Sequence, residues 1–173
     1  IQSTQISFKS LSGMLNVKKE DDLYTLDFPS QEPEKCEMPT PLKEGLGQES
    51  GICFKNEDYM VVFDNEYQID KITPDFNLLT LLDLRGVIVT SPGKDYDFVS
   101  RAFFPKYGIL EDPVTGSAHT KLIPYWSKKL NKSELKAKQI SKRGGELFCE
   151  NKIDRVYISG YAKLYMVGEI QLY

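Results

Sequence analysis

One apolar helical run, set mostly among strand-forming segments, is the feature that most limits how this chain can fold. The run covers Gly116 to Leu130, and its apolar residues recur on related helical faces: Ala118, Leu122, Tyr125, Trp126 and Leu130. Pro124 lies inside the run and predicts a bend or a break, because proline removes a helical hydrogen bond.

Most other segments have the pattern of strands, with alternating or β-branched apolar residues. The candidate strands are two within residues 5–17, on either side of a turn at 12–14, and then 23–28, 52–55, 59–63, 86–90 and 96–104. The tail from Lys136 onward adds candidates around R-G-G-E, R-V-Y-I-S-G and Y-A-K-L-Y-M-V-G-E-I. Thr-Pro pairs at residues 40–41 and 73–74 predict two short helices, with Thr40 and Thr73 as caps. Strands outnumber helices and do not alternate regularly with them, which predicts an α+β fold.

Two features concern the organisation of the chain. Residues 30–41, S-Q-E-P-E-K-C-E-M-P-T-P, are polar and rich in proline, which is typical of a linker between two units. The chain also begins I-Q-S-T-Q-I-S-F, without Met and already in a strand-like alternation. A domain rarely starts inside a strand, so we expect a fragment, a processed form or an incompletely observed chain.

The composition argues against several classes of protein. Hydrophobic residues make up 40% of the chain and charged residues 27%, which is enough apolar material for a packed core. The net charge of −3 argues against a nucleic-acid or anionic-membrane surface, and we interpret the basic cluster at residues 128–143 as a solvated face. No window approaches the roughly 20 apolar residues of a membrane helix.

The three cysteines, Cys36, Cys53 and Cys149, are far apart and form no C-x-x-C pair. This spacing argues against a disulfide framework and against a zinc site, so we expect no metal. Reduced thiols and a cytoplasmic location are the simplest interpretation. A thiol enzyme using Cys53 or Cys149 is a weak alternative, because neither cysteine lies in a recognisable motif.

The stretch E-D-P-V-T-G-S-A-H, residues 111–119, carries the clearest chemical signal. It places an acidic turn directly before the helical run, where the first backbone N–H groups lack partners and carry partial positive charge. A substrate carboxylate can bind there, helped by the hydroxyls of Thr115 and Ser117. Asp112 would lie beside that anion and could transfer protons.

Structural alternatives exist for the same residues. Asp112 could serve only to cap the helix, since acidic turns before helices are common. His119, the single histidine, is more often a packed core residue at such a position than a base.

Longer motifs resemble the PhzF-like family of phenazine biosynthesis. The segment G-I-L-E-D-P-V-T-G-S-A-H, followed by P-Y-W, is the strongest match. Further matches, in the same order, are S-G-M-L-N-V and Y-T-L-D-F-P near the start, S-R-A-F-F-P at residues 100–105, and L-K-A-K-Q-I-S-K-R-G-G-E-L at residues 135–147. The resemblance runs from about residue 4 to the end of the chain.

The resemblance implies a fold like that of diaminopimelate epimerase, in which a curved, barrel-like sheet surrounds a central helix in each of two similar lobes. Residues 42–173 would be the C-terminal lobe, residues 30–41 a linker, and residues 1–29 remnant strands of the N-terminal lobe. The implied activity is cofactor-independent isomerisation of a small carboxylate by proton transfer at carbon.

The resemblance also implies roles for individual residues. Asp112 matches an acid lining the site, and Gly116 and Ser117 match groups that hold the substrate; Thr115 is added from the local chemistry. Arg143, Gly144 and Gly145 are carried over only as a motif that shapes the lobe, with an ordinary tight turn as the alternative.

One part of the family pattern has no counterpart here. The family's principal acid/base glutamate and a glycine-histidine pair belong to the first lobe, and no segment of this sequence matches them. This chain alone is therefore expected to be catalytically incomplete, and a non-catalytic binding or interaction protein is the alternative. Unpaired strand edges next to the absent lobe predict a homodimer or poor solubility.

Overall fold

The computed structural model describes residues 4–11 and 13–171. Within them the strands form one curved sheet in the order β1-β2-β3-β11-β10-β9-β8-β7-β6-β5-β4, with β1 and β4 at its two edges. The pairs β6–β7 and β8–β9 are parallel and the others are antiparallel. The predicted α+β class is confirmed.

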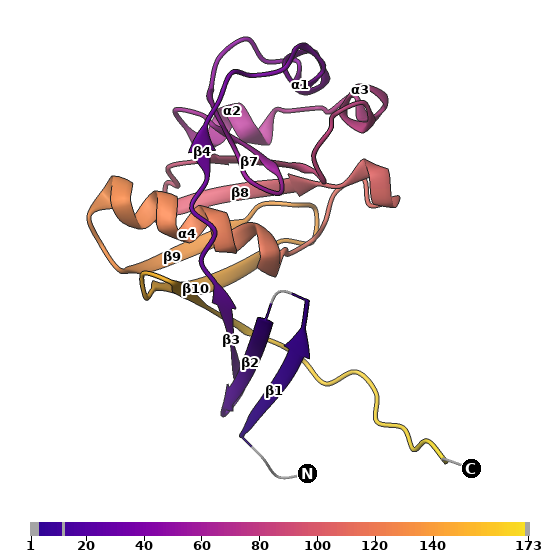
Figure 1. The fold of residues 1–173 in the computed structure, drawn as a ribbon, viewed down its shortest axis with the longest axis vertical. Coiled ribbons are helices and arrows are strands. Elements are labelled where there is room, and N and C mark those ends of the chain that lie inside the picture. Colours follow the sequence, from indigo (N-terminus) through magenta and orange to yellow (C-terminus); the bar gives the residue numbers. More distant parts are fainter. Residues whose placement is uncertain (1–3, 12, 172–173) are drawn as a thin grey trace.

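The strands have the following bounds: β1 (Gln5–Ser10), β2 (Gly13–Glu20), β3 (Leu23–Pro29), β4 (Glu34–Lys35), β5 (Ile52–Lys55), β6 (Tyr59–Val62), β7 (Val87–Ser91), β8 (Phe98–Phe103), β9 (Glu134–Gln139), β10 (Gly145–Asn151) and β11 (Arg155–Tyr161). The helices are α1 (Thr40–Leu46), α2 (Glu66–Asp70), α3 (Phe76–Thr80), α4 (Gly116–Leu130) and the short 3-10 helix η1 (Pro105–Tyr107). Figure 1 labels most of them along the chain.

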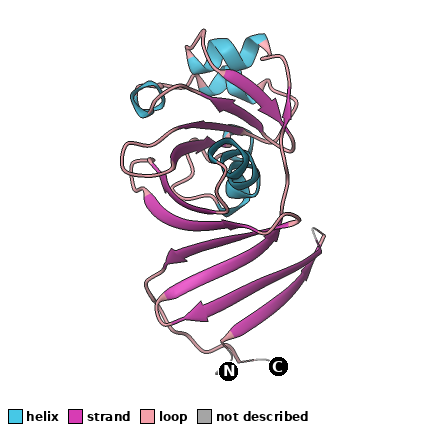
Figure 2. Ribbon diagram, turned by 90° about the vertical axis from the view of Figure 1, so that its left-hand side faces the viewer, coloured by secondary structure: helices cyan, strands magenta, loops and turns pink. Residues whose placement is uncertain are grey.

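The sheet curves around α4, which Figure 2 shows nearly end-on inside the arc of strands. Helix α4 has the bounds predicted from its apolar periodicity. Its buried residues Leu122, Ile123 and Trp126 pack against inward-facing residues of the sheet, including Phe98, whose ring stacks on Trp126. A helix surrounded by strands can be apolar on most of its surface, which explains the unusual run.

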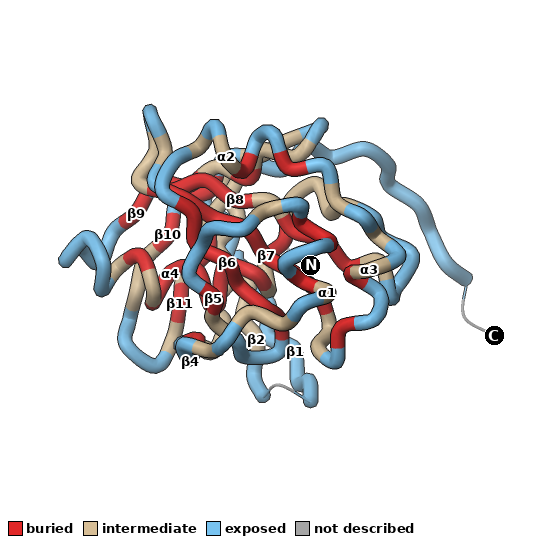
Figure 3. Tube along the Cα trace, turned by 90° about the horizontal axis from the view of Figure 1, so that it is seen from above, coloured by how far each residue is buried: buried red, intermediate tan, exposed pale blue. Residues whose placement is uncertain are grey.

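Helices α1, α2 and α3 cover the outer face of β5–β8. Strand residues alternate between the two layers: Met60 and Ile88 face α4, whereas Val61 and Val87 join the outer core beneath the short helices. This two-sided burial accounts for the continuous apolar runs of β6 and β7. Figure 3 shows buried residues concentrated along these central strands and α4.

The predicted caps of the two short helices are wrong. The N-cap of α1 is Pro39, and Thr40 is already helical. The N-cap of α3 is Asp75, whose side chain accepts hydrogen bonds from the backbone N–H groups of Asn77 and Leu78. A carboxylate that satisfies two N–H groups caps this helix in place of Thr73.

Pro124 does not break α4, which continues through it as one helix. Because Pro124 has no N–H, the carbonyl of Thr120 has no helical partner at that position. That carbonyl instead accepts a hydrogen bond from Gln31 N at 3.0 Å. Thr120 Oγ1 also donates to Gln31 Oε1 at 2.6 Å. The proline therefore opens a docking point on α4 for the segment that was predicted as a linker.

The N-terminal strands β1–β3 form a meander that joins the main sheet where β3 pairs with β11. Ile6, Phe8 and Met14 on this meander are about half exposed. The tail from residue 162 to 171 runs away from the lobe without regular structure, so the strand predicted around Y-A-K-L-Y-M-V-G-E-I is wrong beyond Tyr161, where β11 ends. Residues 1–3 and 12 of the predicted remnant lie outside the described residues. The assignment of strands to a first lobe, the domain boundaries and the homodimer stay predictions.

No helix in the described part of the chain is long and apolar enough to cross a membrane.

Candidate functional site

A cavity of about 420 Å³ opens at the N-terminal end of α4. The acidic turn follows β8 and η1 in the chain and lies at this cavity. Helix α4 begins there and runs toward the centre of the sheet. Three of the four predicted site residues, Asp112, Thr115 and Ser117, line this cavity, and Gly116 lies between them in the chain. The full lining is Arg85, Phe104, Tyr107, Ile109, Asp112, Thr115 and Ser117.

Gln139, a fully buried residue at the end of β9, holds the acidic turn in place. Its amide accepts from Thr115 N at 2.9 Å and donates to the carbonyl of Asp112 at 2.7 Å and to Thr115 Oγ1 at 3.1 Å. The backbone N–H of Asp112 donates to Ala102 on β8 at 2.9 Å. Strands β8 and β9 therefore fix the acidic turn. The local motif did not predict these contacts.

The Asp112 side chain is bound to Thr115 and leaves one oxygen free. Thr115 Oγ1 donates to Asp112 Oδ2 at 2.6 Å, and no partner of Oδ1 is found in the part of the chain that the structure describes. Asp112 is not a helix cap: the N-cap position is Thr115, and no side chain caps α4. The first N–H groups of the helix are therefore left for water or a ligand.

The R-G-G motif, residues 143–145, packs against the acidic turn. Gly145 has no room for a side chain, because a Cβ atom would lie 2.4 Å from Val114 Cγ2. Gly144 adopts a φ of +68°, which favours glycine, and Ser141 Oγ donates to the carbonyl of Pro113 at 2.7 Å. The two glycines thus bring this turn against the acidic turn, while Arg143 is exposed.

Glu111, the other acid of the motif, has a structural partner. Arg101 on β8 forms two hydrogen bonds with its carboxylate, at 2.7 and 3.0 Å, and also donates to the carbonyls of Ile69 and Ile72. This network ties α2 to the start of the acidic turn. Glu111 does not line the cavity.

Arg85, from the loop before β7, is a site residue that the sequence did not reveal. Its guanidinium binds Asp58 through Nε at 2.8 Å and Nη2 at 2.6 Å, and Nη2 also donates to Ser117 Oγ at 3.1 Å. The hydrogen bonds to Asp58 raise the pKa of Arg85 above its ordinary value. Ser117 lies 32 residues from Arg85 in the chain, so local spacing carried no signal of this contact.

His119 belongs to the core around α4. Its side chain is fully buried, Nδ1 lies 2.7 Å from the carbonyl of Thr115, and Nε2 has no partner within the described residues. Burial lowers its pKa from 6.5 to about 4, so the ring is neutral at pH 7. The interpretation of His119 as a packed core residue agrees with this position.

The cysteines have environments that disfavour thiolate chemistry. Cys53 and Cys149 are buried. Burial, with a contribution from Cys36, raises the pKa of Cys53 to about 12, and burial also raises the pKa of Cys149. A thiolate is the reactive form, so neither residue is poised as a nucleophile. No group of three or more His, Cys, Asp or Glu side chains could hold a metal ion within residues 4–11 and 13–171.

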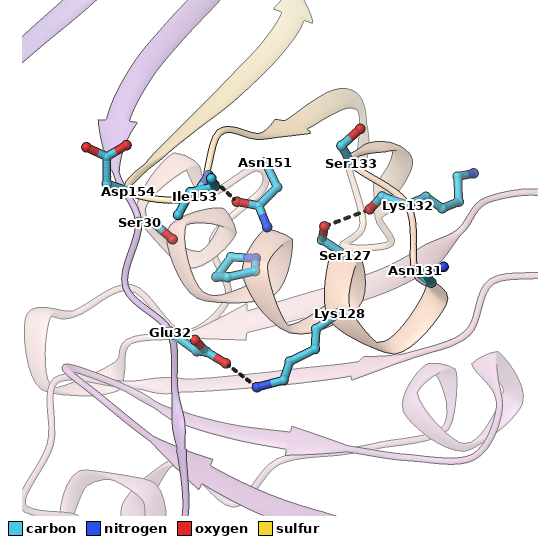
Figure 4. A pocket seen from close by; sticks show the side chains of 11 residues that line it. Ser30, Glu32, Ser127, Lys128, Asn131, Lys132, Ser133, Asn151, Ile153 and Asp154 are labelled. Atoms are coloured by element: carbon cyan, nitrogen blue, oxygen red, sulfur yellow. Dashed lines mark hydrogen bonds and ion pairs between the residues drawn. The ribbon is translucent and has the colours of Figure 1, made fainter.

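A larger cavity of about 610 Å³ lies at the opposite end of α4 (Figure 4). It is crossed by an ion pair between Lys128 and Glu32 at 3.0 Å, and both side chains are largely exposed. Ser127 Oγ donates to the carbonyl of Lys132 rather than to the open space. Volume alone does not locate chemistry, and the smaller cavity holds the buried polar network and the acidic turn.

The geometry can be compared with known proteins. A family profile described as "Phenazine biosynthesis-like protein" (PhzC-PhzF) matches residues 1–168. An uncharacterized isomerase from Pseudomonas aeruginosa is 46% identical over 98% of this chain and 66% of its own length. Another uncharacterized isomerase, from Halalkalibacterium halodurans, is 44% identical over 96% of this chain and 64% of its own length.

Solved structures agree with the fold. A phenazine biosynthesis protein of the PhzF family from Enterococcus faecalis superposes with a TM-score of 0.90, at 47% identity, covering 99% of this chain and 66% of that protein. A structure described as a predicted epimerase from Pseudomonas aeruginosa, at 12% identity and a TM-score of 0.64, shares the fold over 98% of this chain and 68% of its own. The predicted epimerase-like sheet around a central helix is therefore confirmed. The chain spans slightly less than two thirds of these first relatives.

Proposed function

Since this chain belongs to the phenazine biosynthesis-like (PhzC-PhzF) family, we propose that it forms part of an isomerase or epimerase that moves a proton at a carbon atom of a small carboxylate, without a cofactor. The cavity at the start of α4 is proposed as its share of the active site. Asp112 is the proposed acid/base residue, and Gly116 and Ser117 are the proposed substrate-binding residues. Thr115 was expected to bind the substrate as well, but its N–H and its hydroxyl donate to Gln139 and Asp112, so we propose that it orients Asp112.

The position of Asp112 is the observation that carries this proposal. One of its carboxylate oxygens is held by Thr115 at 2.6 Å, and its side chain lines the same cavity as the open N-terminal end of α4. An acid/base group must be oriented and must lie within hydrogen-bond reach of its proton. A carboxylate fixed through one oxygen keeps the other available for that transfer.

The proposed chemistry uses each group once. The substrate carboxylate accepts hydrogen bonds from the first N–H groups of α4 and from the hydroxyl of Ser117. Asp112 takes a proton from a nearby carbon, so that a C–H bond breaks, an O–H bond forms and the electron pair stays on the substrate. A proton then returns at the same or another carbon. The second acid/base group would be the first-lobe glutamate that the family implies.

A second candidate function is binding without turnover. Among the described residues Asp112 is the only carboxylate that lines the cavity, so this part of the protein offers one proton-transfer group where an epimerase needs two. A protein that kept this lobe but lacked the second group would bind a carboxylate and leave its carbon-bound protons in place.

Deuterium incorporation tests the two candidates. Full-length protein is incubated in D₂O with a panel of small carboxylates, and carbon-bound deuterium is followed by NMR. Replacing Asp112 with Asn should slow exchange roughly 10²- to 10⁴-fold, the usual contribution of a general acid/base. Asp70→Asn, at the exposed end of α2, is the control and should exchange like wild type. Binding without exchange would favour the second candidate, and absence of both would refute the isomerase.

A further inference from the structure

Arg85 is a cation of the cavity whose position is fixed on several sides. Its backbone N–H donates to the carbonyl of Glu57 at 3.1 Å, and its guanidinium carbon lies 5.2 Å from the centre of the Phe104 ring. Gly86 permits this stacking, because a Cβ atom there would lie 2.2 Å from Phe104 Cδ1. A guanidinium held this way loses little conformational freedom when it binds a ligand.

Asp58, beneath Arg85, is fully buried and is shared between two cations. It accepts two hydrogen bonds from Arg85, and Lys121 Nζ lies 3.2 Å from Asp58 Oδ2. Lys121, also buried, makes a second ion pair with Glu57 at 3.3 Å. Partial burial would raise the pKa of Glu57, but the charge and hydrogen bond of Lys121, together with Gln31 and Arg85, outweigh it and lower that pKa. A buried carboxylate needs such partners, and it orients Arg85 in return.

Hydrogen-bond donors remain on the cavity side of this network. Ser117 Oγ accepts from Arg85 Nη2, which leaves the hydroxyl hydrogen of Ser117 free to donate. Nη1 of Arg85 makes no hydrogen bond to any residue that the structure describes, and the Arg85 side chain is 31% exposed. Both residues line the cavity, beside the open N–H groups of α4.

We propose that Arg85 binds the substrate's carboxylate together with Ser117, and that Asp58 is the positioning residue that aims Arg85. This inference rests on the proposed function and names the group that recognises its substrate. The charges around this position favour a monoanion over a dianion. Two cations, Arg85 and Lys121, are already opposed by three carboxylates, those of Asp58, Glu57 and Asp112. A phosphate dianion would meet excess negative charge there, whereas one carboxylate can accept from the two hydrogens of Arg85 Nη1, since Nε and Nη2 already donate to Asp58 and Ser117.

The rest of the cavity indicates what adjoins the carboxylate. Phe104, Tyr107 and Ile109 supply the apolar part of its lining, and Tyr107 and Ile109 are exposed. Such a lining suits an apolar or unsaturated ring or chain, because aromatic and aliphatic side chains contribute by burial and stacking. The expected substrate is therefore a monocarboxylate with an apolar or unsaturated body.

Ligand titration of the full-length protein in mildly alkaline buffer, where inorganic phosphate is mainly a dianion, tests this assignment, with benzoate as the carboxylate probe and phosphate as the dianion. Wild type should bind benzoate and bind phosphate more weakly. Arg85→Gln should weaken benzoate binding roughly 10- to 100-fold, the loss of a hydrogen bond to a charged group. Asp58→Asn should weaken it less. Arg85→Lys keeps the positive charge but loses the paired hydrogen bonds to Asp58 that orient the guanidinium, so it should recover only part of the affinity.

Arg155→Gln is the matched control. Arg155 is similarly exposed and binds Asp27 at 2.7 Å, at the junction of β3 and β11, and it does not line the cavity. Its variant should bind benzoate like wild type. Equal affinity of Arg85→Gln and Arg155→Gln, with both folded by circular dichroism, would overturn the role of Arg85, and phosphate binding as tight as benzoate would overturn the preference for a monoanion.

The deuterium-exchange assay separates this inference from the proposed function. If Asp112→Asn loses exchange while Arg85→Gln keeps the wild-type KM for the exchanging carboxylate, the isomerase stands and the assignment of Arg85 is wrong. A raised KM with a smaller change in kcat for Arg85→Gln supports the assignment, because a binding residue acts mainly on affinity. A purely structural Arg85 would lower the unfolding midpoint and leave KM unchanged.

Discussion

Thr115 Oγ1 donates a 2.6 Å hydrogen bond to Asp112 Oδ2, three residues earlier in the chain. The same threonine is the N-cap residue of α4, and its backbone N–H is held by Gln139. One residue therefore links the start of the helix, the neighbouring strand and the proposed acid/base carboxylate. The hydroxyl orients the carboxylate, while the backbone bond keeps the turn in place without it.

This division of labour gives a prediction for Thr115. Thr115→Val keeps the shape and the backbone bond to Gln139 but removes the hydroxyl, which donates to Asp112 and accepts from Gln139 Nε2. Proton exchange should fall at least roughly tenfold, about the value of one hydrogen bond. Thr115→Ser is the control, because it keeps the hydroxyl and should retain most of the activity. Exchange rates measured by NMR check both variants. A loss in Thr115→Ser as large as that in Thr115→Val would show that the hydroxyl alone does not account for the effect.

The contact between Gly145 and Val114 gives a prediction for stability. Gly145→Ala places a Cβ atom 2.4 Å from Val114 Cγ2, so the free energy of unfolding should drop by about 1–3 kcal/mol, as expected for overpacking. The double variant Gly145→Ala, Val114→Ala should recover part of the loss, because the clashing methyl group is gone. Gly168→Ala, where nothing lies within 4 Å, is the control. Urea denaturation measures all of them, and a strictly additive double variant would contradict the clash.

His119 predicts a loss of stability in mild acid. Its pKa is about 4 in the folded protein and about 6.5 when unfolded, so the unfolded chain binds the extra proton between these values. The stabilisation is present above about pH 6.5 and is lost as the pH falls toward 4, by up to about 3 kcal/mol.

Urea midpoints of wild type and His119→Gln at pH 7.0, 6.0 and 5.0 check this prediction. Glutamine is neutral throughout, so the variant should show a shallower decline over this range, whatever its stability at pH 7. Carboxylates titrate in both proteins and cancel in the comparison. Parallel declines would mean that His119 is not buried in its neutral form.

Local signals predicted part of the fold and part of the site. Helix α4 and the acidic turn were predictable, because a helical apolar period and a Pro-Gly turn are encoded in neighbouring residues. Arg85 and Gln139 were not, because their contacts with Ser117 and Thr115 span 32 and 24 residues of chain. Only the curvature of the sheet around α4 brings Arg85 to the cavity and Gln139 to the acidic turn.

Pro124 is a second case in which a local signal was recognised but its tertiary contact could not be predicted. The local rule correctly identified a missing hydrogen bond, but it could not predict that Gln31 would replace the lost partner, and the helix does not break at Pro124. Gln31 uses the freed carbonyl of Thr120, 89 residues away in the chain. Tertiary contacts thus turn a local defect of the helix into an attachment point for another segment.

Cys36 and Cys53 give the last prediction. Their Sγ atoms lie 3.5 Å apart, and Cys36 N donates to the carbonyl of Cys53 at 3.0 Å, which places the two residues opposite each other beside β4 and β5. Neighbouring residues of an antiparallel pair are within the Cα separation that a disulfide needs. Glutathione disulfide should therefore oxidise this pair, with two thiols giving one disulfide and two glutathione molecules.

The reaction should be slow, because burial raises the pKa of Cys53 to about 12 and little thiolate forms. Intact mass should fall by about 2 Da, and peptide mapping should join Cys36 to Cys53 while Cys149 stays reduced. The closed loop of 17 residues should stabilise the oxidised form by about 3 kcal/mol in urea denaturation. Cys36→Ser is the control and should show no mass loss. A mixed disulfide with glutathione, in place of the internal bond, would contradict the cross-strand geometry.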